Sequence, residues 1–201
     1  MTNFLRDDLQ IIAKKIPEGS KVLDLGCGDG SLIKWLQKLK NCKCYGVEIS
    51  HLKVLQCIKK NVNVIQADIE AGLSIFDGNK FDVVVLSQAL QATHKTEVVL
   101  KKTSELGKKV IVSIPNFGHW SHILDLIKGN MPVNHRLPYE WFNTPNWHFA
   151  TINDFEKLLN NLNFSEIEAI YIKENKSDKI EIINKYPKYR CTTAIYQFSG
   201  I

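Results

Sequence analysis

The sequence has no long apolar run, and this absence argues against a membrane-spanning helix. Its longest apolar stretches, such as residues 83–86 and 110–112, are far shorter than the roughly 20 residues that a bilayer requires. Residues 1–10 carry two aspartates and lack the apolar core of a signal peptide. We therefore expect a cytoplasmic protein that is not exported and has no membrane partner.

Metal-type cysteine spacing is also missing. The cysteines number five, Cys42 and Cys44 lie one residue closer than a zinc-binding pair, and no second pair answers them. His119 and His122 have the spacing of two ligands on one helix face but lack the glutamate of H-E-x-x-H. We expect no metal site and reduced, mostly buried thiols.

Clustered charge of one sign is a third absence. The formal net charge is +5, but the lysines are scattered, and the densest basic stretch, residues 173–190, also contains acidic side chains. This pattern is typical of a solvated surface, so we expect no nucleic-acid partner. Repeats and low-complexity tracts are absent too, and 201 residues with 44% hydrophobic content predict a single domain, 1–201.

What the chain does have is a regular alternation of strands and helices. Apolar runs predict strands over 21–25, 43–47, 62–66, 81–86 and 109–114, and two late strands over 167–172 and 191–198. Amphipathic stretches separate the first five, Ser50 is a good N-cap, and Thr151 with Asp154 resembles a capping box. The pattern predicts an α/β, Rossmann-like fold whose seven-stranded sheet is mainly parallel, with helices on both faces.

Residues 115–149 interrupt this alternation. They contain four of the six prolines, three of the four tryptophans and four of the six histidines. We expect a structured insertion after the fifth strand, built from turns without a regular element. Its aromatic and basic side chains either pack the loop down or form a recognition surface for a partner or substrate. The candidates for recognition are His119, Trp120, Arg136, Tyr139, Trp141, Trp147 and His148.

The strongest signal for chemistry is the glycine turn Val22–Gly30, which lies between the first strand and the following helix. Glycines at such a turn accept positive φ and let the backbone approach a ligand closely. A nicotinamide fingerprint would need a glycine at position 31, where this chain has Ser31. The spacing G-x-G-x-G, with Asp24 two residues before the first glycine, favours S-adenosylmethionine, whose α-amino group an acidic residue can hold.

Two further acidic residues support this cofactor. Glu48 lies 22 positions beyond Gly26 at the end of the second strand, where an acidic residue binds ribose hydroxyls. Asp68 follows the third strand and can accept a hydrogen bond from the adenine amino group. We expect S-adenosylmethionine or S-adenosylhomocysteine to be bound by Asp24, Gly26, Cys27, Gly28, Gly30, Glu48, Ile49, Asp68, Ile69 and Ser87. Within the turn, Cys27 is expected to be a packing thiol rather than a nucleophile, and no catalytic residue is predicted.

Further motifs resemble the methionine biosynthesis protein MetW family, which is built on the class I methyltransferase fold. They extend the likeness over Lys21–Leu162 and comprise residues 84–91 (VVLSQALQ), 113–120 (SIPNFGHW), 129–132 (GNMP), 137–139 (LPY) and 144–146 (TPN). The chain departs from the family pattern at Ser121–Ile123 and Asn130, where arginines are usual. The resemblance implies a role in methionine synthesis, in which the protein associates with a homoserine O-acyltransferase and supports its activity.

Two interpretations of the function remain open at this point. In the first, the domain is a binding and activating subunit that presents Trp120, Tyr139, Trp141 and Trp147 outward. In the second, it is an active methyltransferase for a small molecule, and residues 115–148 form a lid that turns several of these aromatics inward.

Overall fold

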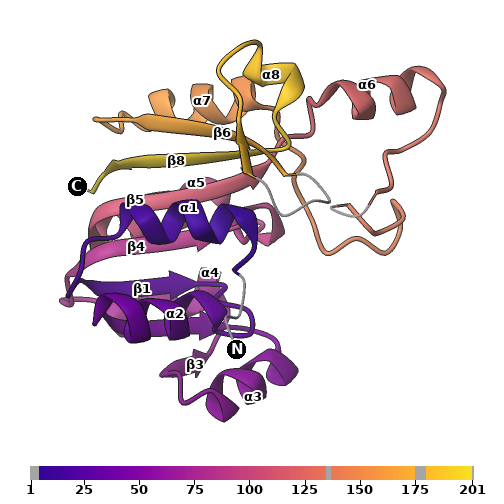
Figure 1. Ribbon diagram of the computed structural model, residues 1–201. Helices are drawn as coiled ribbons and strands as arrows, with labels where there is room; N and C mark the ends of the chain where they lie inside the picture. The colour runs from indigo at the N-terminus through magenta and orange to yellow at the C-terminus, as the bar shows by residue number, and fades with distance from the viewer. Residues whose placement is uncertain (1–4, 135–136, 175–179, 201) are drawn as a thin grey trace.

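The computed structural model describes residues 5–134, 137–174 and 180–200 (Figure 1). The elements in chain order are α1 (Asp7–Lys15), β1 (Lys21–Leu25), α2 (Ser31–Lys40), β2 (Lys43–Glu48), α3 (His51–Lys59), β3 (Val64–Gln66), α4 (Ile69–Gly72), η1 (Leu73–Phe76), β4 (Phe81–Ser87), η2 (Leu90–Ala92), α5 (Thr96–Leu106), β5 (Gly107–Pro115), α6 (Trp120–Ile127), α7 (Ile152–Asn161), β6 (Glu168–Glu174), β7 (Ile180–Ile182), α8 (Pro187–Arg190) and β8 (Thr193–Ser199). The predicted α/β alternation is therefore confirmed.

The strands form one sheet in the order β3-β2-β1-β4-β5-β8-β6-β7. The pairs among β1 to β5 are all parallel, whereas β8 is antiparallel to both β5 and β6. The sheet has eight strands where seven were expected, because the short β7 pairs with the end of β6. Since the chain order reverses between β1 and β4, the carboxyl ends of these two strands form the switch point at which ligands bind in open α/β sheets.

Alternating side chains on the central strands supply two separate cores. Val83 and Val85 pack on one face with α1, α2 and α3, and Val84 and Leu86 pack on the other with α5 and α7. Residues Val110 to Val112 of β5 are divided in the same way. A strand buried on both faces reads as a continuous apolar run, which is why β4 and β5 were recognisable in the sequence.

The helix ends were predicted with mixed success. Thr151 caps α7 as expected, because its hydroxyl oxygen accepts from the Asp154 N–H and its O–H donates to the Asp154 carboxylate at 2.6 Å. Ser50 occupies the N-cap position of α3 without a capping bond from its side chain.

The prediction that the insertion holds no regular element was wrong. Helix α6 lies within it and extends away from the sheet (Figure 1). Its N-cap is His119, whose ring accepts a hydrogen bond from the Ser121 N–H. This local bond begins the helix. Because the helix does not bury apolar residues at regular intervals, it lacks the buried face by which a helix is recognised in a sequence.

None of the helices in the described ranges is long and apolar enough to cross a bilayer.

Candidate functional site

The glycine turn takes the predicted position between β1 and α2. Gly26, Gly28 and Gly30 have φ values of 76°, 58° and 73°, a region that favours glycine. The N–H groups of Gly26 and Cys27 both donate to the Val47 carbonyl oxygen, at 2.8 and 3.0 Å. These bonds hold the turn against the end of β2.

The glycines of the turn serve different purposes. A Cβ on Gly26 would lie 2.6 Å from the Cβ of Ala89, so this position is closed by packing. A Cβ on Gly28 would meet no atom within 4 Å. The backbone at Gly28 therefore borders open space, as expected where a ligand lies against the chain.

Asp24, next to the last residue of β1, carries a buried carboxylate. The residue is 3% exposed, and its Oδ1 atom has no hydrogen-bond partner. Burial raises the pKa of Asp24 to about 7; the Arg6 guanidinium opposes this shift, and the Glu48 and Asp8 carboxylates add to it. Since buried polar atoms are nearly always paired in native proteins, Oδ1 is an acceptor suited to a cationic ligand group.

Glu48 ends β2 and is held from two sides. Its Oε2 atom accepts from the Gly28 N–H at 2.8 Å, and its Oε1 atom accepts from the Ser50 N–H at 2.9 Å. Each carboxylate oxygen has a second lone pair, so Glu48 can still accept bonds from hydroxyl groups. Ile49 beside it is 64% exposed and offers an apolar surface.

Asp68 and Ile69 lie where the third strand ends. The Asp68 Oδ1 atom accepts from the Glu70 N–H at 2.9 Å and caps α4, and the side chain is exposed. The Ile69 Cδ1 atom is 3.6 Å from the position of a Cβ on Gly26. Ile69 therefore borders the glycine turn, and Asp68 precedes Ile69 in the chain.

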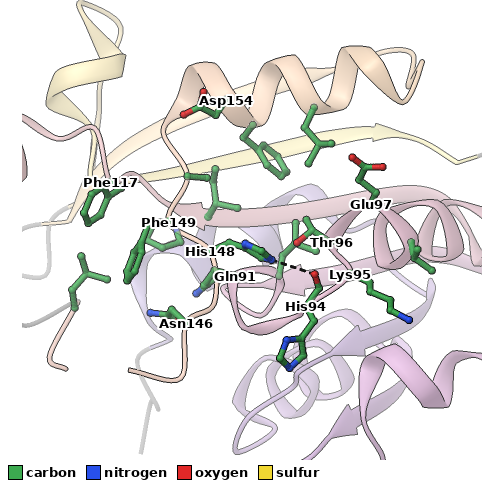
Figure 2. Close-up of a pocket in the computed structure, with 18 residues that line it drawn as sticks. Gln91, His94, Lys95, Thr96, Glu97, Phe117, Asn146, His148, Phe149 and Asp154 are labelled. Carbon is green, nitrogen blue, oxygen red and sulfur yellow. Dashed lines mark hydrogen bonds between the residues drawn. The ribbon is translucent and has the colours of Figure 1, made fainter. Parts of the chain in front are cut away.

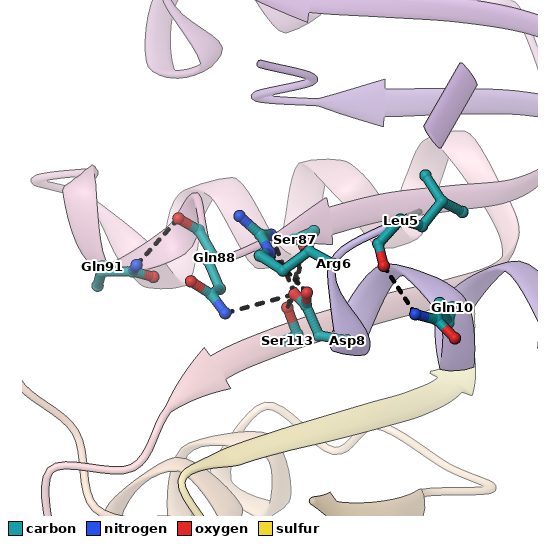
Figure 3. Close-up of polar contacts among 8 residues, drawn as sticks. All are labelled: Leu5, Arg6, Asp8, Gln10, Ser87, Gln88, Gln91 and Ser113. Carbon is teal, nitrogen blue, oxygen red and sulfur yellow. Dashed lines mark hydrogen bonds and ion pairs between the residues drawn. The ribbon is translucent and has the colours of Figure 1, made fainter. Parts of the chain in front are cut away.

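Ser87, at the end of β4, belongs to a buried polar network that the sequence analysis missed (Figure 3). The Asp8 carboxylate is fully buried and pairs with Arg6 at 2.6 Å. It also accepts from the hydroxyls of Ser87, at 2.9 Å, and Ser113, at 3.1 Å. The Arg6 side chain is 48% exposed, and its charge acts on Asp24 at the same sheet edge. A signal was present, because Asp8 interrupts the apolar face of α1 one turn from Leu5 and Ile12.

Cys27 is a buried thiol. It is 8% exposed, and burial raises its pKa far above the ordinary value, with Asp24 acting in the same direction. An ionised nucleophile is disfavoured there, and the thiol packs in the core among apolar side chains, as expected for a packing residue. All five cysteines are buried. Among the described residues, no group of three His, Cys, Asp or Glu side chains could hold a metal ion.

The candidate recognition residues differ in how exposed they are. Trp120 is 53%, Tyr139 44%, Trp141 72% and Trp147 63% exposed. His119 is buried, and His148 approaches the His94 carbonyl oxygen through Nε2 at 3.3 Å. Arg136 lies outside the described residues. Most of the aromatic surface therefore faces solvent.

Comparisons with known proteins give a family and a fold. The sequence model described as "Methionine biosynthesis protein MetW" matches residues 6–198. A curated relative from Rhodopirellula baltica, named bifunctional methionine biosynthesis protein MetXA/MetW, is 31% identical over 205 residues. The alignment covers 96% of this chain and 33% of that protein, so the chain spans about a third of its relative's length.

Two solved structures share the fold. A SAM-dependent methyltransferase from Thermotoga maritima superposes with a TM-score of 0.70 at 18% identity, covering 96% of this chain and 87% of that chain. The N-terminal domain of EvdMO1, solved in the presence of SAH and D-fucose, gives a TM-score of 0.63 at 15% identity, covering 97% and 82%. The fold is the class I methyltransferase fold that the family resemblance implied.

Proposed function

Because this chain belongs to the MetW family of methionine biosynthesis proteins, we propose that it is an S-adenosylmethionine-binding subunit that associates with a homoserine O-acyltransferase and supports its activity. Three features support the proposal: the residues at the sheet edge, the exposed face of α6, and the joining of MetXA and MetW in one relative.

The residues at the sheet edge fit S-adenosylmethionine. The unpartnered Asp24 Oδ1 atom suits the α-amino group, and the guanidinium of the half-exposed Arg6 side chain suits the α-carboxylate. Glu48 would hold the ribose hydroxyls and Asp68 the adenine amino group, while the open space at Gly28 admits the ligand. When bound, the cofactor supplies a methyl group on an already activated sulfonium.

Helix α6 carries the surface that we assign to the acyltransferase. Only His122 of this helix is buried, whereas Trp120, Leu124 and Ile127 are 53%, 44% and 76% exposed. Their spacing of four and three residues places them on one helix face. An apolar stripe of this kind on a protruding helix is typical of a protein–protein interface.

This exposure is the single observation that separates the two interpretations of the function. An active enzyme whose insertion closes over a methyl acceptor should turn several aromatics inward, whereas Trp120, Tyr139, Trp141 and Trp147 are each at least 44% exposed. The outward arrangement favours the subunit. In the bifunctional relative the two parts share one polypeptide, and such tethering maintains a high effective concentration between parts that act together.

The test is homoserine acylation by the acyltransferase of the same source, at matched enzyme concentration, with and without this protein. We expect a large increase in rate that accompanies co-purification of the two chains. An unchanged rate without association would reject the subunit role, and methyl transfer to small molecules would then be assayed with the isolated chain.

A further inference from the structure

A second hollow lies apart from the glycine turn. Its volume is about 590 Å³, within the range of small-molecule pockets, and it is bounded by η2, the start of α5, the end of β5, the insertion and α7 (Figure 2). None of the residues predicted to bind the cofactor lines it. The hollow is therefore a separate site, and its interpretation does not rest on the proposed function.

Two of the residues that line this hollow each carry a buried polar atom without a partner. These atoms are the Gln91 Oε1 atom and the Thr96 Oγ1 atom. The Gln91 Nε2 atom donates to the Gln88 carbonyl oxygen at 2.9 Å, which holds the amide with Oε1 as its remaining acceptor. A buried polar atom without a partner destabilises the folded protein, so two in one hollow point to a ligand that satisfies both.

Apart from the half-buried Asn146, the remaining lining is apolar or exposed. Ile114, Leu137 and Phe155 are buried, and they form the interior with Leu90 and Leu158. The charged side chains Lys95, Glu97 and Asp154 all belong to exposed residues, and the Asp154 carboxylate already accepts from the Thr151 hydroxyl. The polar atoms inside the hollow are uncharged, and burying a charge against an apolar wall would be unfavourable.

The wall of the hollow is held in place by the backbone. The N–H groups of Trp147 and His148 donate to the Gln91 carbonyl oxygen, at 2.9 and 3.1 Å. The Trp147 ring lies 4.0 Å, centroid to centroid, from that of His94. The insertion is thus fixed to η2, and the pocket exists before a ligand binds.

We propose that this hollow binds an uncharged, largely apolar small molecule. A hydrogen-bond donor of the ligand meets the Gln91 Oε1 atom, and a second polar atom of the ligand meets the Thr96 hydroxyl. An aromatic or branched body with a terminal amide or hydroxyl has this chemistry, and the rings of Phe117, Phe149 and Phe155 in the lining suit such a body.

The proposal can be tested with three probes that share one phenylpropyl skeleton and differ in the end group: 3-phenylpropanamide, 3-phenylpropanoate and 3-phenylpropylamine. Titration of the full chain, followed by amide NMR, should show saturable binding of the neutral amide at millimolar concentration. Its shifts should centre on Gln91, Thr96 and Ala150, and both charged probes should bind more weakly. Lack of binding by the amide, or equal binding of all three probes, would overturn the proposal.

Two variants locate the probe. Ala150→Phe fills the hollow and should abolish binding, whereas Ala71→Phe, on exposed helix α4, should not alter it. Thr96→Val should weaken binding by roughly 2- to 10-fold, as expected for one lost hydrogen bond. It should keep or raise the melting temperature, because it removes an unpartnered hydroxyl.

Unchanged affinity in Thr96→Val together with a lower melting temperature would assign the hydroxyl to folding and reject the ligand. A second outcome would also reject the ligand. If the acyltransferase, and no probe, protects the Ala150 amide from hydrogen exchange, the hollow receives a side chain of the partner.

Discussion

The ionised Asp24 carboxylate lowers the stability of the folded protein but is expected to favour ligand binding. Its pKa is raised from 3.8 to about 7 by burial, so the folded protein holds this proton more tightly than the unfolded chain. The stabilisation due to the raised pKa is fully present below about pH 4 and is lost as the pH rises to about 7. We expect Asp24→Asn to raise the free energy of unfolding of the ligand-free protein at pH 8 by roughly 2–4 kcal/mol.

The same substitution should weaken S-adenosylmethionine binding. Wild-type affinity should increase as the pH rises through about 7, where Asp24 ionises, and Asp24→Asn should lose this dependence. Urea denaturation at pH 8 measures the effect on stability. Calorimetric titration below and above pH 7 measures the effect on binding. Asp77→Asn, an exposed acidic residue outside the site, is the control and should alter neither. A stabilised Asp24→Asn variant that binds as well as wild type would contradict the assignment of Asp24.

Gly28 and Gly19 form a matched pair for the cofactor site. Both have positive φ, 58° and 73°, and a Cβ on either would meet no atom within 4 Å. Replacement of either glycine by alanine should therefore lower the free energy of unfolding by a similar amount, about 1 kcal/mol, because of backbone strain alone. Only Gly28→Ala should also reduce S-adenosylmethionine affinity, by at least about tenfold, because its methyl group occupies the ligand's space. Thermal unfolding and calorimetric titration of the two variants test this; equal affinities would place the ligand elsewhere.

The sequence predicted site residues that recur at regular intervals along the chain, but not contacts between residues far apart in it. Asp24, Glu48 and the glycines were predictable because parallel strands bring their carboxyl ends to one edge at regular intervals. The Arg6 and Asp8 network was not, since it joins Arg6 to Ser87 over 81 positions and Ser113 to Asp8 over 105. No local period carries such pairing.

At the scale of elements, α6 provides a further test. Ile127 on α6 is 76% exposed, and Ile58 on α3, at the opposite side of the sheet, is 57% exposed (Figure 1). Ile127→Lys and Ile58→Lys should each change the free energy of unfolding by less than about 0.5 kcal/mol, as usual for surface positions. Ile127→Lys should abolish co-purification and the rise in acylation rate, and Ile58→Lys should keep both. If the Ile127→Lys variant still associates with the acyltransferase, the interface does not include this face of α6.

Most elements with a buried apolar face were predictable, whereas most of the short or exposed ones were not, the exposed strand β3 being an exception. β4 and β5 have continuous apolar runs because both of their faces are covered. α6 leaves its apolar face exposed and begins at a histidine cap, while α4 and α8 span only four residues each. Pieces so short depend on tertiary contacts rather than on propensity, so a sequence window does not detect them.

Across the whole molecule, one turn connects the cofactor edge with the insertion. The Cβ of Ala89 lies against Gly26, and two residues later the Gln91 carbonyl oxygen accepts the N–H groups of Trp147 and His148. A ligand that shifts the glycine turn therefore acts on the segment that holds the exposed aromatics. Since S-adenosylmethionine is made from methionine, this connection gives the proposed complex a route for end-product control.

Such control has a thermodynamic signature that is independent of the route. If S-adenosylmethionine changes the affinity between this chain and the acyltransferase by some factor, the acyltransferase must change the affinity for S-adenosylmethionine by the same factor. We expect a difference of roughly 5- to 150-fold between the isolated chain and the complex, measured by calorimetric titration of each. Gly28→Ala should abolish the response of acylation to the cofactor while leaving association intact. Equal affinities would exclude regulation, because a ligand that binds both states equally shifts neither.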